Sequence, residues 1–482
     1  MLQQLKKFKA IEVAALAILL TSAVFVLFYR LGAEPIQSWD EGYYAVVADN
    51  TGLSLVPKLD GKPLLEKPPL GIWLEAASMK IFESPTFGLR FPAALFSLGS
   101  FILLFLLGKK LGSVWIGFFA SLLLLLSPLF LHPHHMARTG DLDTMLMFTV
   151  IGTFYFYICS WTKPKLLIWS GVMIGLGVML RGSPLAIFAG IIFLHWIISK
   201  GWKHTPFRYW LWAFVAACVI ALPWHIYMTI VFGYEFIRTY LFSSVVGRAF
   251  AVIDGHDGGI VRGLGPFSYY YDFLKLNFGW LMPLTYIVTL WLLWKGFVKK
   301  EKVHLLIALW IVITFVILFS MKTKIYWYLM PVLPAFYLGY LMLVQELYTK
   351  KKWLSILLAI AISISAIQGF WNVKANVFNP PTTSTIKSVA AQISAKGMGP
   401  EVLVSGGDLE MGESLLFPDA EWYLNREYNL NAKYLDFEDL PLDSQEPLNL
   451  ITDANGLAAL KNASKNYDII SQVDHLYIVR IQ

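Results

Sequence analysis

Long apolar runs separated by short polar connections dominate the pattern of this 482-residue chain. Most runs have the ~17–25 residues that an α-helix needs to cross the hydrocarbon core of a bilayer, and two are shorter. The pattern therefore predicts a polytopic α-helical membrane protein of about eleven spans, at 11–29, 89–107, 113–131, 144–160, 166–180, 184–198, 210–231, 278–294, 303–320, 326–344 and 353–371.

The connections alternate in charge, and this alternation predicts the orientation of the chain. If the N-terminus is cytoplasmic, every basic connection falls on the cytoplasmic side, where Lys and Arg are enriched. These connections are KKFK (6–9), GKK (108–110), TKPK (162–165), SKGWKH (199–204), KGFVKKEK (295–302) and TKKK (349–352). We therefore expect a multi-pass protein of the inner (plasma) membrane with its C-terminus outside.

One short apolar segment, PPLGIWLEAASMKIF at 68–82, contains Glu75 and Lys80. If it crossed the membrane, every later basic connection would move to the outer side. We expect instead an interfacial helix along the outer surface. The outer side then holds a loop at 30–88, a turn at 132–143, a long loop at 232–277 and a turn at 321–326.

The chain after the last apolar run is more polar and predicts a small separate domain. TTSTIKSVAAQISAKG is typical of a Thr-capped helix that ends at a glycine. EVLVS, YDIISQV and HLYIVRI have the pattern of strands. We predict a transmembrane domain at 1–372 and a soluble, extracytoplasmic α/β domain at 373–482.

Composition supports this class. The chain is 57% hydrophobic and 15% charged, whereas soluble domains are about a quarter charged. The net charge of +7 lies mostly in the short connections, as membrane insertion requires, so it does not indicate a nucleic-acid partner. Cys159 and Cys218 both lie in apolar runs, and a disulfide framework is not expected.

Ionisable residues gather on the predicted outer side. Such groups at the edge of a bilayer are costly unless they are solvated or paired, so their gathering favours a functional site. The alternative is a set of solvated loop charges, and a carboxylate in the first turn of a helix is also favoured by the helix dipole. The group comprises Asp40, Glu41, Glu66, Lys67, Asp141, Asp143, Asp254, His256, Asp257, Lys322 and Lys324.

Three segments in this order, WDEGYYAVVADN…LVPKLDGKPLLEKPPLGIWL, LRFPAALF and ARTGDLDTMLMF, resemble the aminoarabinose transferases and bacterial protein O-mannosyltransferases of the GT-C superfamily. The resemblance covers roughly residues 10–345 and is strongest over 38–148. Such enzymes transfer a sugar from a polyprenyl-phosphate carrier at the outer face to an acceptor hydroxyl or phosphate, without a nucleotide cofactor. The resemblance implies that donor as a partner and a membrane lipid environment, and leaves the sugar and the acceptor open.

The resemblance also implies roles for individual residues. Asp40 matches the catalytic acidic residue, Asp143 supports the same cavity, and Lys67 contacts the donor phosphate. Glu66 and His256 match a glutamate and a histidine that bind a divalent metal, for which these ligand types suit zinc or manganese. The catalytic candidates also include Glu41, and the candidates for donor-phosphate binding also include Arg248, Lys324 and Tyr326.

The chemistry of this transfer suits the same residues without the resemblance. Displacing a polyprenyl phosphate needs a group that activates the acceptor oxygen, which an ionised carboxylate can do. It also needs cations at the leaving phosphate, which Lys67, Arg248 or a metal can supply. Gly42, Tyr43 and Leu64 depart from residues common in the family, so the donor sugar is not fixed by the motif.

Two other functions remain as alternatives. A transporter or flippase of lipid-linked substrates predicts paired halves and charged or broken helices near the bilayer midplane, whereas the charges here gather at one face. A non-catalytic membrane scaffold leaves the set of Asp40, Lys67 and Asp143 unexplained. HPHH (132–135) resembles a metal cluster but is interrupted by Pro133, and Arg181 is expected to snorkel or to form an ion pair.

Overall fold

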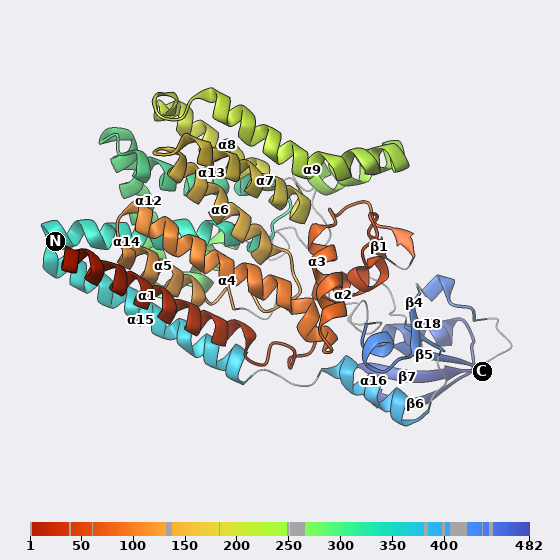
Figure 1. Ribbon diagram of the computed structural model, residues 1–482. Helices are drawn as coiled ribbons and strands as arrows, with labels where there is room; N and C mark the ends of the chain where they lie inside the picture. Colours follow the sequence, from red (N-terminus) through yellow and green to blue (C-terminus); the bar gives the residue numbers. More distant parts are fainter. Residues whose placement is uncertain are drawn as a thin grey trace.

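The structure is a computed structural model that describes residues 2–37, 40–59, 61–131, 137–182, 184–247, 250, 266–379, 384–397, 401–404, 422–435, 437–442 and 447–482. A bundle of long helices adjoins a small domain built on a sheet (Figure 1). The N-terminus lies at one end of the bundle, and the sheet domain lies beyond the opposite end, next to helices α2 and α3 (Figure 1).

The helices of the bundle follow the predicted apolar runs. In the described part of the chain, nine helical segments are long and apolar enough to cross a membrane, and Val114–Leu125 and Pro184–Ile198 are shorter apolar helices. Together they account for the predicted runs. The helices are α1 (Leu2–Phe28), α4 (Pro85–Leu111), α5 (Val114–Leu125), α6 (Asp143–Ser160), α7 (Leu167–Arg181), α8 (Pro184–Ile198), α9 (Phe207–Phe236), α11 (Pro266–Phe278), α12 (Met282–Leu293), α13 (Lys302–Ser320), α14 (Leu333–Lys350) and α15 (Lys352–Val373).

The prediction of a long loop at 232–277 is wrong for the described parts of this segment. Helix α9 continues to Phe236, a π-helix η3 follows at Ile237–Gly247, and α11 begins at Pro266. Gly233 adopts a φ of +55° inside α9, which kinks the helix where the apolar run stops. The chain remains helical beyond the kink, because a kink changes the direction of a helix without ending it.

Two short helices and a hairpin follow α1 at the end of the bundle near the sheet domain. They are α2 (Asp40–Thr51), the strands β1 (Lys58–Leu59) and β2 (Lys62–Pro63), and α3 (Leu70–Ile81). Helix α3 contains Glu75 and Lys80, and among the described residues it is neither one of the helices long and apolar enough to cross a membrane nor one of the shorter apolar helices. The prediction that 68–82 is not a span is confirmed.

The predicted basic connections meet at the other end of the bundle. Lys109 at the end of α4 is 2.7 Å from Glu12 near the start of α1. Lys295, beyond α12, is 2.9 Å from Glu346 near the end of α14. The short helices α2 and α3 and the basic connections therefore lie at opposite ends of the bundle, which is the relative arrangement that the charge pattern predicts.

The C-terminal region forms a mixed sheet with strand order β4-β3-β5-β7-β6. Strand β3 pairs parallel with β4 and β5, while β7 pairs antiparallel with β5 and β6. The predicted strands EVLVS, YDIISQV and HLYIVRI correspond to β3, β6 and β7. The bounds are α16 (Thr385–Ala395), β3 (Glu401–Val404), β4 (Asn431–Tyr434), β5 (Leu448–Thr452), α18 (Ala454–Asn462), β6 (Tyr467–Val473) and β7 (Leu476–Ile481).

The N-cap of helix α16 is a serine and not a threonine. The side chain of Ser384 accepts a hydrogen bond from Lys387 N at 3.1 Å and is the N-cap. The predicted Thr cap is therefore wrong, because the helix starts at the last hydroxyl residue that has extended backbone. The predicted terminal glycine is confirmed, since Gly397 has a φ of +59°.

The sheet domain packs directly on the short helices at the end of the bundle. Ala45 of α2 and Ile72 of α3 share one apolar cluster with Val389 of α16 and Ile478 of β7. Arg426 forms an ion pair with Asp49 of α2. The division at 372/373 into two domains remains a prediction, but these contacts show that the sheet domain supports the segment that carries Asp40.

Candidate functional site

A cavity of about 380 Å³ opens among six helical segments, α6, α7, α8, η3, α13 and η7 (Tyr326–Val332), near α2 and α3. Its volume lies within the ~300–1,000 Å³ typical of ligand pockets. One part of the wall is charged and the rest is apolar. The wall is formed by Glu66, Lys67, Asp143, Leu146, Arg181, Gly182, Pro184, Ala186, Ile187, Phe188, Tyr240, Ser244, Thr314, Ile317, Leu318, Met321, Trp327, Tyr328 and Pro331.

Asp143 and Arg181 form the ion pair at the charged part of this wall. Asp143 is the first residue of α6 and Arg181 the last of α7, so two neighbouring helices bring them together. Arg181 Nε is 3.2 Å from Asp143 Oδ1, and the side chains are only 7% and 3% exposed. Pairing was expected for Arg181, and it is confirmed. Arg181 Nη1 is buried and has no hydrogen-bond partner among the described residues, so the guanidinium keeps a donor for a further acceptor.

Tyr44 of α2 connects this pair to Lys67 and Asp40. Lys67 Nζ lies 5.9 Å from the centre of the Tyr44 ring. Burial raises the pKa of Tyr44 well above its ordinary value, and the negative charges of Asp40 and Asp143 raise it further. The hydroxyl therefore stays protonated. Asp40 is half-buried at the start of α2 and is not in the cavity wall, but its charge acts on this cluster.

Glu41, next to Asp40, points into the protein interior and is 1% exposed. Arg90 of α4 donates to both of its carboxylate oxygens, from Nε at 2.6 Å and from Nη2 at 2.9 Å. The backbone N–H of Gly140 donates to Oε1 at 2.8 Å, and that of Gln37 donates to Oε2 at 2.7 Å. Glu41 thus joins the start of α2 to α4 and to the segment before α6, and its oxygens are already engaged.

Glu66, the predicted metal ligand, lies in the cavity wall and accepts a hydrogen bond from the Tyr43 hydroxyl at 3.2 Å. Within the described ranges, no group of three or more His, Cys, Asp or Glu side chains is placed to hold a metal ion. His256 and Arg248 lie outside the described residues, as does the HPHH segment. The metal site therefore remains a prediction for which only the glutamate is placed.

Lys324 lies beside the cavity rather than in its wall. Its ammonium donates to the backbone carbonyls of Leu318 at 3.0 Å, of Phe319 at 2.7 Å and of Met321, at the end of α13. Burial lowers the pKa of Lys324 below its ordinary value. An ammonium has three donors, so a phosphate could bind Lys324 only if one of these contacts were replaced. Tyr326 begins the 3₁₀ segment η7 (Tyr326–Val332), whose Trp327 and Tyr328 line the cavity.

Three buried charged residues near the site were not among the residues predicted to act in it. Arg90 lies in the motif LRFPAALF, so its partnership with Glu41 had a signal in the sequence. Arg181 had a weaker signal, since a lone arginine at the end of an apolar run also fits snorkelling. Glu75 of α3 is completely buried, and both of its oxygens lack a hydrogen-bond partner among the described residues.

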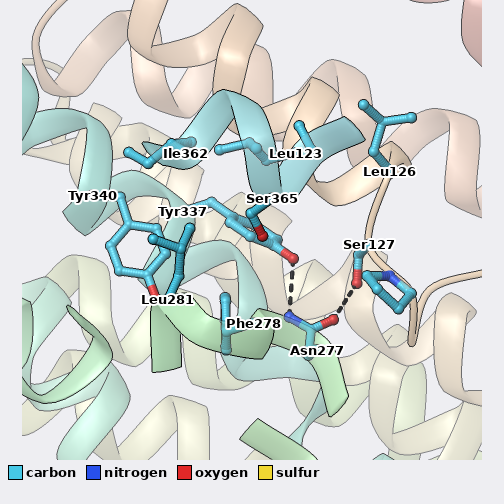
Figure 2. Close-up of a pocket in the computed structure, with 12 residues that line it drawn as sticks. Leu123, Leu126, Ser127, Asn277, Phe278, Leu281, Tyr337, Tyr340, Ile362 and Ser365 are labelled. Atoms are coloured by element: carbon cyan, nitrogen blue, oxygen red, sulfur yellow. Dashed lines mark hydrogen bonds between the residues drawn. The ribbon is translucent and has the colours of Figure 1, made fainter. Parts of the chain in front are cut away.

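A second, much smaller void lies deeper in the bundle, between α5, α11, α14 and α15 (Figure 2). Ser127 donates to Asn277 Oδ1 at 2.6 Å, and Asn277 Nδ2 donates to the Tyr337 hydroxyl at 3.1 Å (Figure 2). Its volume of about 20 Å³ is room for about one water molecule. It is too small for a substrate, and Ser127, Asn277 and Tyr337 form hydrogen bonds with one another at its wall.

Known proteins resemble this chain in sequence and in structure. Residues 66–227 match the family described as dolichyl-phosphate-mannose-protein mannosyltransferase. The undecaprenyl phosphate-alpha-4-amino-4-deoxy-L-arabinose arabinosyl transferase of Pseudomonas savastanoi pv. phaseolicola is 29% identical over 216 residues, which are 43% of this chain and 40% of that relative. The chain therefore matches less than half the length of this relative.

Two solved structures give the fold. ArnT from Cupriavidus metallidurans bound to undecaprenyl phosphate superimposes with a TM-score of 0.69 over 96% of this chain and 97% of that chain, at 14% identity. Archaeal oligosaccharyltransferase AglB from Archaeoglobus fulgidus, in complex with an inhibitory peptide and a dolichol-phosphate, gives a TM-score of 0.56 at 12% identity over 88% of this chain and 64% of that chain. The chain is a multi-pass membrane protein with the GT-C glycosyltransferase fold, and it resembles the aminoarabinose transferases.

Proposed function

We propose that this protein is a glycosyltransferase that moves a sugar from a polyprenyl-phosphate donor to an acceptor hydroxyl or phosphate at the outer face of the membrane. One observation carries the proposal: the cavity joins a charged end, with Lys67, Asp143 and Arg181, to an apolar wall on α8 and α13. A polyprenyl-phosphate sugar has the same two parts, a charged head and a long apolar tail. The names of the similar proteins support the same donor class.

The cations of the charged end suit the leaving phosphate. In the transfer, the acceptor oxygen attacks the anomeric carbon, the bond from that carbon to the phosphate oxygen breaks, and the polyprenyl phosphate departs with the electron pair. Negative charge grows on the phosphate, and preorganised donors there lower the barrier. Lys67 and the open Nη1 of Arg181 are cationic donors in the described wall. We keep Arg248, Lys324 and Tyr326 as further candidates for this contact.

Asp40 is the proposed general base. An ionised carboxylate can take the proton from the acceptor hydroxyl as that oxygen attacks. Asp40 lies at the start of α2 beside the charged cluster, outside the crowded wall, where an acceptor can approach. Asp143 then has a positioning role, because it holds Arg181 at 3.2 Å. Glu41 has a positioning role too, because its oxygens accept hydrogen bonds from Arg90, Gly140 and Gln37.

A divalent metal remains part of the proposal, with Glu66 and His256 as ligands and zinc or manganese as the ion. A bound cation there would neutralise phosphate charge. Glu66 fits this role in that its carboxylate faces the cavity. Metal analysis of the purified protein tests the idea: one equivalent of metal that is lost in both Glu66→Gln and His256→Ala supports it, and an absence of metal in the active protein contradicts it.

We also propose the orientation that the basic connections predict. The N-terminus is cytoplasmic, the domain at 373–482 is extracytoplasmic, and the protein resides in the inner membrane. The basic connections lie at one end of the bundle, and α2 and α3 lie at the other. This arrangement supports the proposal that the whole site is on one side of the membrane. A periplasmic-type reporter fused after Gln482 should be active, and a reporter active there only in the cytoplasm would contradict the orientation.

The decisive experiment is a transfer assay with the purified chain in liposomes. A radiolabelled undecaprenyl-phosphate sugar is supplied with candidate acceptors, and the labelled product is separated from the donor. A transferase forms a new covalent product, whereas a flippase changes only the leaflet that holds the intact donor. The comparisons favour the transferase over the transporter. Movement of intact donor without any product from a range of lipid, glycan and protein acceptors would overturn the proposal.

A further inference from the structure

An apolar groove of about 480 Å³ lies between α7, α8 and α9, on the side of the charged cavity that is nearer to the basic connections. Leu167 at the start of α7 and Ile192 of α8 form its buried floor, while Phe207 and Phe214 of α9 stand on its rim at 61% and 67% exposed. The charged cavity instead contacts Arg181 at the end of α7. Along α7 the groove ends at Ile174, about 10 Å from Arg181. On α8 the two are adjacent, because Phe188 lines the charged cavity and Ala189 lines the groove.

Small residues create this groove. A Cβ atom added to Gly171 would lie 1.9 Å from the carbonyl oxygen of Ala213, so α7 and α9 touch along their backbones. Gly190 of α8 also lines the groove, but a Cβ atom added there would meet nothing within 4 Å. The close contact of α7 with α9 and the missing side chain on α8 leave a space that faces the lipid bilayer.

The mouth of the groove carries positive charge without any carboxylate nearby in sequence. Leu167 follows Lys165 by two residues, and Phe207 directly precedes Arg208. No Asp or Glu occurs between Thr144 and Tyr234. The exposed cations of this region are Lys163, Lys165, Lys200, Lys203 and Arg208, and none of them forms an ion pair with a residue that the structure describes.

Other basic connections at the same end of the bundle differ in this respect. Lys109 is paired with Glu12 at 2.7 Å, and Lys295 and Lys350 are paired with Glu346 at 2.9 and 2.7 Å. Insertion topology accounts for cations in any of these connections. It does not account for their coincidence here with an apolar groove and with the lack of ion-pair partners among the described residues.

We propose that this groove binds an anionic glycerophospholipid of the bilayer, with an acyl chain against α7, α8 and α9 and the headgroup phosphate at the basic mouth. The charge and the apolar groove are complementary to the two parts of such a lipid, and basic pockets between transmembrane helices on the cytoplasmic side are a recognised type of lipid site. The groove adjoins the proposed donor cavity on α8 but shares no lining residue with it, so it holds a structural or regulatory lipid whether or not the proposed transfer is correct.

The test is native mass spectrometry of the full chain with dioleoylphosphatidylglycerol or dioleoylphosphatidylcholine. Wild type should retain the anionic lipid in preference to the zwitterionic one. Lys203→Gln combined with Arg208→Gln should weaken retention on the order of tenfold, because each cation near the lipid surface contributes to the attraction. Gly190→Leu should weaken retention of the anionic lipid similarly by filling the groove.

Two control variants distinguish a loss of lipid binding at this groove from general effects of helix propensity or surface charge. Gly190→Ala improves helix propensity as Gly190→Leu does but leaves most of the groove open, so it should bind lipid like wild type. Lys351→Gln combined with Lys352→Gln removes two exposed cations from the same end of the bundle, away from the groove, and should also bind like wild type. A loss of retention in this control equal to that in Lys203→Gln/Arg208→Gln would overturn the proposal.

Two further outcomes would also overturn it. Equal retention of the two lipids by wild type would remove the role of charge. Displacement of phosphatidylglycerol by an equimolar amount of undecaprenyl phosphate, abolished in Gly190→Leu, would assign the groove to the polyprenyl carrier instead. Neither outcome bears on transfer at the charged cavity, which the liposome assay measures independently.

Discussion

Glu41 and Arg90 form a two-pronged ion pair in the protein interior, with Arg90 Nε and Nη2 at 2.6 and 2.9 Å from the two carboxylate oxygens of Glu41. Both side chains are 1% exposed. The pair joins α4 to the start of α2, where Asp40 stands. The acidic dipeptide Asp40-Glu41 therefore contains two carboxylates with different surroundings, and we expect different consequences when each loses its charge.

Glu41→Gln should destabilise the fold. Removing one charge of a buried ion pair leaves the other uncompensated, which costs about 3–5 kcal/mol. Thermal unfolding in detergent measures this loss. Glu12→Gln is the matched control, because its pair with Lys109 is 29% and 42% exposed and exposed pairs contribute about 1 kcal/mol or less. A Glu41→Gln protein that unfolds like wild type but lacks turnover would assign Glu41 to the chemistry instead.

Asp40→Asn should retain the fold and lose activity. The substitution keeps the shape of the side chain but removes its basicity, and loss of a general base typically lowers the rate by ~10²–10⁴-fold. The liposome assay measures the rate, and the unfolding temperature should match wild type because Asp40 is only half-buried. Near-normal turnover of Asp40→Asn would show that another group activates the acceptor.

Lys67→Gln and Arg181→Lys should both weaken use of the donor. Lys67 and Arg181 line the charged end of the cavity, whereas Lys58 of β1 does not. Arg181→Lys keeps the positive charge but loses the forked guanidinium. In wild type that group pairs with Asp143 through Nε while Nη1 stays available to another acceptor. We expect kcat/KM for the donor to fall on the order of tenfold or more in each variant, the equivalent of roughly 1.4 kcal/mol.

Lys58→Gln is the control for these two variants, since it removes a cation from the same outer segment. It should leave kcat/KM for the donor unchanged. If Lys58→Gln lowered kcat/KM as much as Lys67→Gln, the effect would be one of general surface charge, and the cavity would lose its assignment to the phosphate.

Glu75→Gln should stabilise the protein at neutral pH. Burial raises the pKa of Glu75 well above its ordinary value of 4.5, and the charges of Asp141 and Glu41 raise it further. Below pH 4.5 the carboxyl group of Glu75 is protonated in both the folded and the unfolded chain, so Glu75 does not lower the stability of the fold. As the pH rises above this value the unfolded chain ionises first, so stability falls by about 1.4 kcal/mol per pH unit until the pKa of the folded state is passed.

The measurement for Glu75 is the difference in unfolding temperature between Glu75→Gln and wild type at several pH values. The advantage of the variant should be small near pH 5 and larger near pH 7. The comparison with wild type cancels the titration of the other carboxylates. A variant that is less stable than wild type at pH 7 would indicate that Glu75 is ionised and has a partner that stabilises it.

The apolar runs and their connections were enough to predict the spans, their order and the relative sides of the connections. Hydrophobicity and length are properties of a segment alone, so each apolar run could be assigned without knowing its neighbours. The same holds for α3, whose charges Glu75 and Lys80 argue against a span. Asp40, Lys67 and Asp143 were placed on one side because they follow or precede predicted spans, and the motif order added the resemblance to the GT-C superfamily.

The pairing of the charges could not be predicted from the sequence, because it follows from the packing of the helices. Glu41 meets Arg90 across 49 residues of sequence, and Asp143 meets Arg181 where two helices end side by side. Lys324 donates to the carbonyls that end α13 instead of extending into the cavity. The physical reason is that these helices are apolar on nearly every face. No polar stripe then shows which side of a helix faces its neighbour, so partners at the helix ends follow from helix rotation and packing, which no local pattern encodes.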